Sequence, residues 1–416
     1  MTITHGKLAG FFLCSVSALW CFQIGVGGAG VPMYLIFLPL TFLLPLPRHV
    51  FPVALSIFAA ILLLLLVALL VGVNILRAEV SLVALFILMV AIVVTAQALP
   101  ISYRTGWVHL AKALKIFINL QILVQFIQIA GLQFPSYLAL PHYFLPIVRP
   151  PGLLTEPSFV ATTFSPIVFA SLWPKEKVFG GSMNQWDFFK VYFILILCPS
   201  TTAIVMLMLA ILLRMVAWQP LLAFVSFAIL IAVWKNLLIL VELLPPDVAD
   251  RINVLIYLLQ TGYFDQHSNL SSVVLFGGLT AAQTTLHSFP LGVGFLNMAS
   301  VYNLDSLSYY RQVVGDNNIN DGSSMLFKII AEFGYLGVAF ATYGVFAILR
   351  YFSVPRPDVT MGLLAFPFLV SFARGGSYLD GPVMIAIAII LFGFNHMEGR
   401  RFGRGTPSVL TSYIKS

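Results

Sequence analysis

Long apolar runs without charge constrain this chain more than any other feature. Residues 51–76, for example, contain no charged side chain and are long enough to cross about 30 Å of hydrocarbon as a helix. Of the 416 residues, 60% are hydrophobic and 9% are charged, whereas soluble globular domains carry about 25% charged residues. The sequence therefore predicts an all-α polytopic membrane protein rather than a series of soluble domains.

The apolar runs divide into twelve predicted membrane-spanning segments. They lie near residues 8–26, 30–46, 51–75, 80–99, 113–131, 157–173, 188–198, 201–217, 220–243, 326–349, 360–373 and 382–396. Pro199, followed by Ser200, separates the seventh segment from the eighth because proline interrupts a helix. This separation also keeps most of the 22 basic residues on one side of the membrane.

Basic residues decide the orientation of these segments, because cytoplasmic loops are enriched in lysine and arginine. With the N-terminus inside, the C-terminus is also cytoplasmic, and the loops 132–156, 244–325 and 374–381 face outward. The chain then divides into three parts. Residues 1–243 hold nine transmembrane helices, 244–325 form a large periplasmic loop with short helices, and 326–416 hold three helices and a basic cytoplasmic tail.

Several function classes lack their usual sequence signals. The net charge is +7, but no basic cluster lies on a soluble surface, so no nucleic-acid partner is predicted. Cys14, Cys21 and Cys198 form no disulfide framework, and no C-x-x-C, H-E-x-x-H or D-x-D string occurs. The sequence therefore predicts neither a metal nor a cofactor.

The basic residues of the three outward loops are all arginine. They are Arg149, Arg251, Arg311 and Arg374. The planar guanidinium binds phosphate oxygens in pairs and keeps its charge at low dielectric, so four converging arginines would suit a lipid-linked diphosphate. Two alternatives stay open: Arg251 can pair locally with Asp247, and Arg149 and Arg374 can extend to the membrane interface as ordinary anchors.

Glu156 is the most informative acidic residue of the outward loops. It stands one position before Pro157 at the start of the sixth predicted segment, which suits an ordinary helix start. It can equally act as a base at the lipid–water boundary. His267 and His287 are further candidates for that role, although a lone loop histidine is commonly only solvated.

Five features, in this order along the chain, resemble the Wzy-type polysaccharide polymerases and O-antigen ligases of bacterial inner membranes. The similarity is greatest to exopolysaccharide polymerases of the xanthan type. The features are Arg149…Gly152…Glu156-Pro157-Ser158 before an apolar helix, the break Cys198-Pro199-Ser200-Thr201, a long outer loop, Pro290-Leu291-Gly292-Val293-Gly294, and Ala331-Glu332-Phe333-Gly334-Tyr335-Leu336-Gly337.

This resemblance implies metal-independent glycosyl transfer between undecaprenyl-diphosphate-linked glycans, with the diphosphate held by Arg149 through the motif match. Arg251, Arg311 and Arg374 match only by loop and residue type. It also implies a chain-length regulator and a flippase as partners in the same membrane. Two positions depart from the family pattern. Ser323-Ser324 replaces a His-Asn pair common in ligases, which favours a polymerase, and Val274 stands where many members carry arginine.

Two alternatives to a polymerase stay open. A ligase would transfer the glycan to a different acceptor, and a transporter or flippase would move lipid-linked sugars without forming a bond. Transporters usually show related halves, and no internal repeat is visible here. A nucleotide-sugar enzyme is disfavoured because the cytoplasmic loops are short and D-x-D is absent, whereas a lipid-diphosphate donor needs only arginines at the outer face.

Overall fold

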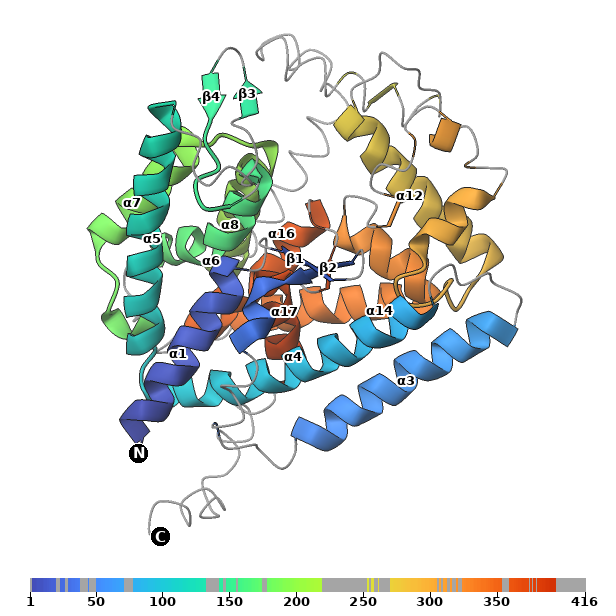
Figure 1. Cartoon of the computed structure of the whole chain (residues 1–416), viewed down its shortest axis with the longest axis horizontal. Helices are drawn as coiled ribbons and strands as arrows, with labels where there is room; N and C mark the ends of the chain where they lie inside the picture. The colour runs from blue at the N-terminus through green and yellow to red at the C-terminus, as the bar shows by residue number, and fades with distance from the viewer. Residues whose placement is uncertain are drawn as a thin grey trace.

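The fold is described from a computed structural model, which is largely helical (Figure 1). It describes residues 2–19, 23–26, 29–37, 44, 50–70, 78–131, 142–144, 147–154, 156–173, 178–218, 253, 256–257, 261, 270–304, 307, 310–312, 315, 319–320, 324–353, 359–373, 375, 377–378 and 380–393.

The helices and strands follow the apolar segments of the sequence. The α-helices are α1 (Thr2–Leu19), α3 (Val50–Leu70), α4 (Ala78–Arg104), α5 (Val108–Ile129), α6 (Pro157–Ser171), α7 (Gln185–Leu197), α8 (Thr201–Trp218), α12 (Leu270–Ser288), α14 (Met325–Ser353), α15 (Thr360–Ala365), α16 (Pro367–Ala373) and α17 (Gly381–Ala388). Shorter elements are the strands β1 (Gln23–Val26), β2 (Ala29–Pro32), β3 (His142–Phe144) and β4 (Ile147–Arg149), the 3₁₀ helices η1 (Met33–Phe37), η2 (Phe179–Gly181) and η3 (Met298–Asn303), and the π-helix η4 (Ile389–Gly393).

The predicted helical class is confirmed, and part of the chain has the length and apolar character of membrane spans. Within the described residues, three helices meet both criteria: Ser81–Arg104, Val108–Ile129 and Met325–Ser353. Apolar helices of 10–17 residues occupy Leu55–Leu66, Thr202–Val216, Thr360–Ala373 and Gly381–Phe392. Twelve crossings and the periplasmic position of the large loop stay predictions, and segment 220–243 lies outside the described residues.

The predicted spanning helix at 30–46 is wrong in its described part. Ala29–Pro32 instead pairs antiparallel with Gln23–Val26, and Met33–Phe37 is a short 3₁₀ helix. The first predicted segment therefore ends earlier than expected, at Leu19. Glycine is the physical reason, because the sequence Gly25-Val26-Gly27-Gly28-Ala29-Gly30 lowers helix propensity by about 1 kcal/mol per glycine relative to alanine.

The predicted break at Pro199 is confirmed. Helix α7 ends at Leu197 and α8 begins at Thr201. The guanidinium of Arg214, near the end of α8, lies 4.0 Å from the ring centroid of Trp173, just beyond the end of α6. The C-terminal ends of α6 and α8 therefore lie together.

Helix ends that the charge pattern assigns to the cytoplasm gather at one end of the molecule. Gly6 packs against Thr105, and Gly180 packs on the carbonyl of Gly106. The Trp173 ring stacks on Phe352 with centroids 5.2 Å apart. This grouping is consistent with the predicted topology.

A second hydrophobic core forms where the sequence predicts short helices on the outer membrane face. Residues 270–288 form one helix of 19 residues, α12, which packs on α14 (Figure 1). Their shared core is Val273, Val274, Ala281, Val293, Met298, Ala299, Val301, Tyr302, Leu307, Tyr310, Ile319 and Ala331. The described part of the large loop is thus a packed unit built onto α14.

Candidate functional site

Three glutamines of α5 hold the loop that follows Arg149. Gln121 Nε2 donates to the carbonyl of Pro151 at 2.8 Å, and Gln121 Oε1 accepts from the amide of Leu153 at 2.8 Å. Gln128 makes both bonds to one residue, donating to the carbonyl of Gly152 at 2.9 Å and accepting from its amide at 2.8 Å. We call Pro150–Leu153 the amide-held loop.

Gln125 completes this set from the middle of the same helix face. Its Nε2 donates to the carbonyl of Pro150 at 3.0 Å and to that of Ile194 in α7 at 3.3 Å. All three glutamine side chains are buried. Proline has no amide hydrogen, so the only donors of the amide-held loop are Gly152 and Leu153, and both are bonded. Pro150, Pro151 and Gly152 are buried, and glutamine side chains bond their three carbonyls and both amides of the loop, as apolar surroundings require.

Arg149 is the last residue of strand β4, immediately before the amide-held loop. The strands β3 and β4 form an antiparallel hairpin in which Arg149 is the register partner of His142. The Arg149 side chain lies outside the described part of the structure. The backbone on its C-terminal side is fixed by Gln125 at Pro150.

Glu156 follows the same loop and occupies the N-cap position of α6. Pro157 is the first helical residue, as predicted for a helix start, but the Glu156 side chain makes no capping hydrogen bond. Instead its Oε2 accepts a hydrogen bond from Ser158 Oγ at 3.0 Å, and the side chain is half-buried. The carboxylate is thus oriented by a neighbour and partly accessible, which suits a base.

The motifs at 290–294 and 331–337 are far apart in the sequence, but their backbones are directly hydrogen-bonded to each other. The amides of Val293 and Gly294 donate to the carbonyls of Ala331 and Glu332, each at 3.0 Å, and the Tyr335 amide donates to Pro290 O at 2.9 Å. Gly334 has φ 57° and ψ −134°, which interrupts α14. A Cβ on Gly334 would stand 2.0 Å from Pro290 O, and one on Gly292 would stand 2.2 Å from Glu332 O. Both positions therefore require glycine.

A buried polar cluster lies beside this docked pair. It consists of Lys328, Glu332 and Tyr378, all of them buried. The Tyr378 hydroxyl donates to Glu332 Oε2 at 2.7 Å, and Lys328 Nζ lies 3.9 Å from Glu332 Oε1. Burial, together with the adjacent Glu332 carboxylate, raises the pKa of the Tyr378 phenol well above its ordinary value. Tyr378 therefore acts as a hydrogen-bond donor throughout the physiological pH range.

Of the remaining predicted site residues, the structure describes His287 and Arg311. His287 is exposed in the last turn of α12. Arg311 is also exposed, and its Nη1 donates to Asn303 Oδ1. His267, Arg251 and Arg374 lie outside the described residues. The convergence of the four arginines therefore stays a prediction.

Sequence reasoning missed the residues that hold the loops. The glutamines 121, 125 and 128 recur at intervals of four and three in an apolar segment, which places them on one helix face. Lys328 and Glu332 likewise stand four residues apart, and charges inside apolar segments indicate a special role. These signals were available, but nothing in the spacing identified Pro150–Leu153 or Tyr378 as their partners.

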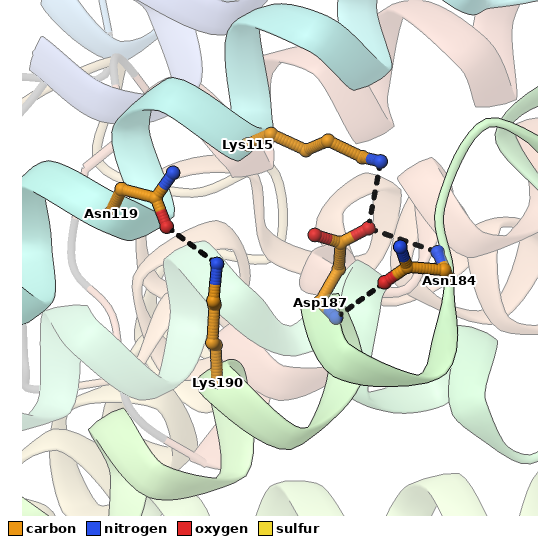
Figure 2. Close-up of polar contacts among 5 residues, drawn as sticks. All are labelled: Lys115, Asn119, Asn184, Asp187 and Lys190. Carbon is orange, nitrogen blue, oxygen red and sulfur yellow. Dashed lines mark hydrogen bonds and ion pairs between the residues drawn. The ribbon is translucent and has the colours of Figure 1, made fainter.

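Two further polar contacts join the middle of α5 to the N-terminal half of α7 (Figure 2). Lys115 Nζ lies 2.9 Å from Asp187 Oδ2, and Lys190 Nζ donates to Asn119 Oδ1 at 2.8 Å. Asp187 also forms a capping box with Asn184, which begins α7. These contacts add to the link between α5 and α7 that Gln125 makes by donating to the carbonyl of Ile194.

Comparison with protein-family models, with curated proteins and with solved structures finds no match to this chain. The resemblance to the polymerase and ligase family therefore rests on the sequence motifs alone.

Proposed function

We propose that the protein polymerises undecaprenyl-diphosphate-linked oligosaccharide repeat units by glycosyl transfer at the periplasmic face of the bacterial inner membrane. One observation carries most weight: three buried glutamines bond the backbone of the amide-held loop, Pro150–Leu153, which lies between Arg149 and Glu156. Burying three amide side chains for packing alone is unfavourable. A loop held this firmly is what a site needs to present an arginine and a carboxylate in fixed positions.

The proposed reaction needs only groups that these loops supply. Arg149 binds the diphosphate of the donor, and Arg251, Arg311 and Arg374 complete the anion site. A hydroxyl of the acceptor repeat unit attacks the anomeric carbon of the donor glycan, and the bond from that carbon to the diphosphate oxygen breaks. The diphosphate leaves with the electron pair, stabilised by the guanidinium groups. Glu156 takes the hydroxyl proton, with His267 and His287 as the other candidates for this base.

Reconstitution in liposomes with one purified lipid-linked oligosaccharide tests the proposal directly. Chain lengthening without a second acceptor, seen by gel electrophoresis of the labelled glycan, is the expected result. Transfer that requires a different acceptor would identify a ligase. Movement across the bilayer without a new glycosidic bond would identify a transporter and overturn the proposal.

The substitution Arg149→Lys separates bidentate binding from charge. Lysine keeps the positive charge but loses the planar pair of donors, so we expect polymer yield to fall at least about tenfold, as the loss of one charge-assisted hydrogen bond implies. Arg104→Lys, the same change at the exposed end of α4, serves as the control. Wild-type yield from the Arg149 variant contradicts a diphosphate clamp.

The substitution Glu156→Gln tests the proposed base. Glutamine keeps the size of the side chain and an oxygen that accepts the Ser158 hydrogen bond, so folding should be preserved. We expect the transfer rate to fall by about 100-fold or more, the usual loss on removal of a general base. Normal expression with a normal rate would leave Glu156 as a helix-start residue only.

A further inference from the structure

Helix α7 begins beside the middle of α5, and the two helices run in the same direction. Their side-chain contacts step along both helices in the same order: Lys115 to Asp187, Asn119 to Lys190, and Gln125 to Ile194. Helix α5 also has the length and apolar character of a membrane span. The polar residues before these contacts therefore lie at one end of a helix pair whose other residues are largely apolar.

Two lysines of this helix pair carry a charge that no described acidic residue balances. The carboxylate of Asp187 is already paired with Lys115, 2.9 Å away (Figure 2). Lys190 bonds instead to the neutral side chain of Asn119, with Nζ 2.8 Å from Oδ1. Within the part of the chain that the structure describes, neither Lys190 nor Lys112 forms an ion pair. Their positive charge is thus available to an anion.

These two lysines meet at one exposed strip of α5. Lys112, Ile116, Asn119 and Leu123 follow one another at intervals of four, three and four residues, so they lie on one helix face. All four are exposed, and we call them the α5 strip. Because Asn119 belongs to this strip and accepts a hydrogen bond from Lys190, the ammonium group of α7 reaches the same face. Lys112 lies about 10 Å before Asn119 along the helix axis.

The exposed residues beside the two lysines are apolar and aromatic. Trp186 and Phe189 of α7 contact each other edge to face, with ring centroids 5.7 Å apart, and Trp186 is 69% exposed. In the α5 strip, Ile116 and Leu123 are exposed as well. Tryptophan is enriched where the hydrocarbon of a membrane meets its headgroups. The combination of available ammonium groups and exposed apolar side chains matches an anion that carries acyl chains, because a free anion would use the charges alone.

We propose that α5 and α7 form a binding site for an anionic phospholipid. Its phosphate lies at Lys112 and Lys190, and its acyl chains lie along Ile116 and Leu123. Basic residues between membrane helices commonly bind such headgroups. Helix α5 also carries the glutamines that hold the amide-held loop, so the lipid binds to the helix that supports this loop. The proposal does not depend on glycosyl transfer, since lipid binding can be measured without any oligosaccharide.

Native mass spectrometry of the full-length protein in detergent micelles tests the proposal. Phosphatidylglycerol and phosphatidylcholine with identical acyl chains serve as probes, because only the first has a net negative charge. We expect the Kd of phosphatidylglycerol to rise about fivefold for each lysine removed, in Lys112→Gln and in the double variant Lys112→Gln/Lys190→Gln. The Kd of phosphatidylcholine should stay unchanged. An equal Kd of phosphatidylglycerol in the wild type and the double variant overturns the proposal.

Arg350→Gln is the control for the loss of one positive charge. Arg350 is exposed in the last turn of α14, outside the α5–α7 pair, so this change should leave the Kd of phosphatidylglycerol unaltered. A rise as large as that of Lys112→Gln would show general attraction to the protein surface and overturn a local site. Lys112→Gln breaks no hydrogen bond or ion pair among the described residues, so this variant keeps the test valid even if changes at Lys190 impair folding.

Two further measurements distinguish a phospholipid from a free anion. Inorganic phosphate, added at the same concentration as phosphatidylglycerol, should leave the lipid bound, whereas displacement would identify a free-anion site and overturn the assignment. Ile116→Ser keeps both lysines but removes apolar contact, so the Kd of both lipids should rise several-fold, since they share their acyl chains. An unchanged Kd of both lipids in this variant overturns the placement of the acyl chains on the α5 strip.

Discussion

Two loops are attached to helices by buried side chains, but by different chemistry: the amide-held loop before α6, and the loop between α16 and α17 that contains Tyr378. Neutral amides of Gln121, Gln125 and Gln128 hold the first through several side-chain-to-backbone hydrogen bonds. One carboxylate, Glu332, holds the second and also balances Lys328. The first attachment is distributed, so the loss of one partner leaves the others. The second attachment is concentrated in one side chain, so the loss of Glu332 leaves both the buried Lys328 ammonium and the buried Tyr378 hydroxyl without this partner.

The largest effect is expected where the attachment is concentrated. Glu332→Ala leaves Lys328 buried without a counter-charge, and we expect the free energy of unfolding to fall by about 3–5 kcal/mol, as for other broken buried pairs. Adding Lys328→Met removes the stranded charge and should restore part of the loss. Unfolding in mixed detergent micelles measures both variants. Equal losses in the single and double variants would contradict a concentrated ionic attachment.

A smaller effect is expected in the amide-held loop. Gln128→Leu leaves the amide and carbonyl of Gly152 without their partner, and we expect a loss of about 1–3 kcal/mol. Gln283→Leu, the same change at an exposed position of α12, is the control and should have little effect. If Gln128→Leu destabilised the protein as much as Glu332→Ala, the attachment would not be distributed.

The smallest effect is expected at the ion pair shown in Figure 2. Lys115 is partly exposed, with 31% of its side chain accessible, so solvent weakens its attraction to Asp187. We expect Lys115→Met to lower the free energy of unfolding by less than about 1 kcal/mol. The same micelle unfolding experiment at low and high salt measures it. A loss as large as that of Glu332→Ala would show that exposure does not separate the two ion pairs.

Local sequence signals predicted the helices better than the contacts between them. The apolar runs placed α5 and α14, and Pro199 placed the break between α7 and α8, because these features depend on neighbouring residues. The helix predicted at 30–46 was wrong because the prediction followed the apolar character of this segment, whereas the glycines at 25, 27, 28 and 30, just before it and at its first position, favour the β1–β2 hairpin.

The candidate site was predicted only in part, since its key contacts join distant parts of the chain. The sequence pointed to Glu156 as a helix start and to the motifs at 290–294 and 331–337, but not to their docking. Similarly, the glutamine spacing indicated a polar face on α5, whereas its partner, the loop at Pro150, follows from the tertiary arrangement. The functional roles of the predicted site residues stay predictions.

The reciprocal contact of Gly292 and Gly334 has a practical consequence for protein engineering. Because Pro290 and Tyr335 are directly hydrogen-bonded, the two ends of the stretch between them lie next to each other. Lengthening a stretch whose ends are already joined costs only about 0.6 kcal/mol per doubling of its length. Gly315, which is exposed with open space around its Cα, is therefore a suitable insertion site for an epitope tag, whose accessibility in intact cells would report the sidedness of this part of the chain.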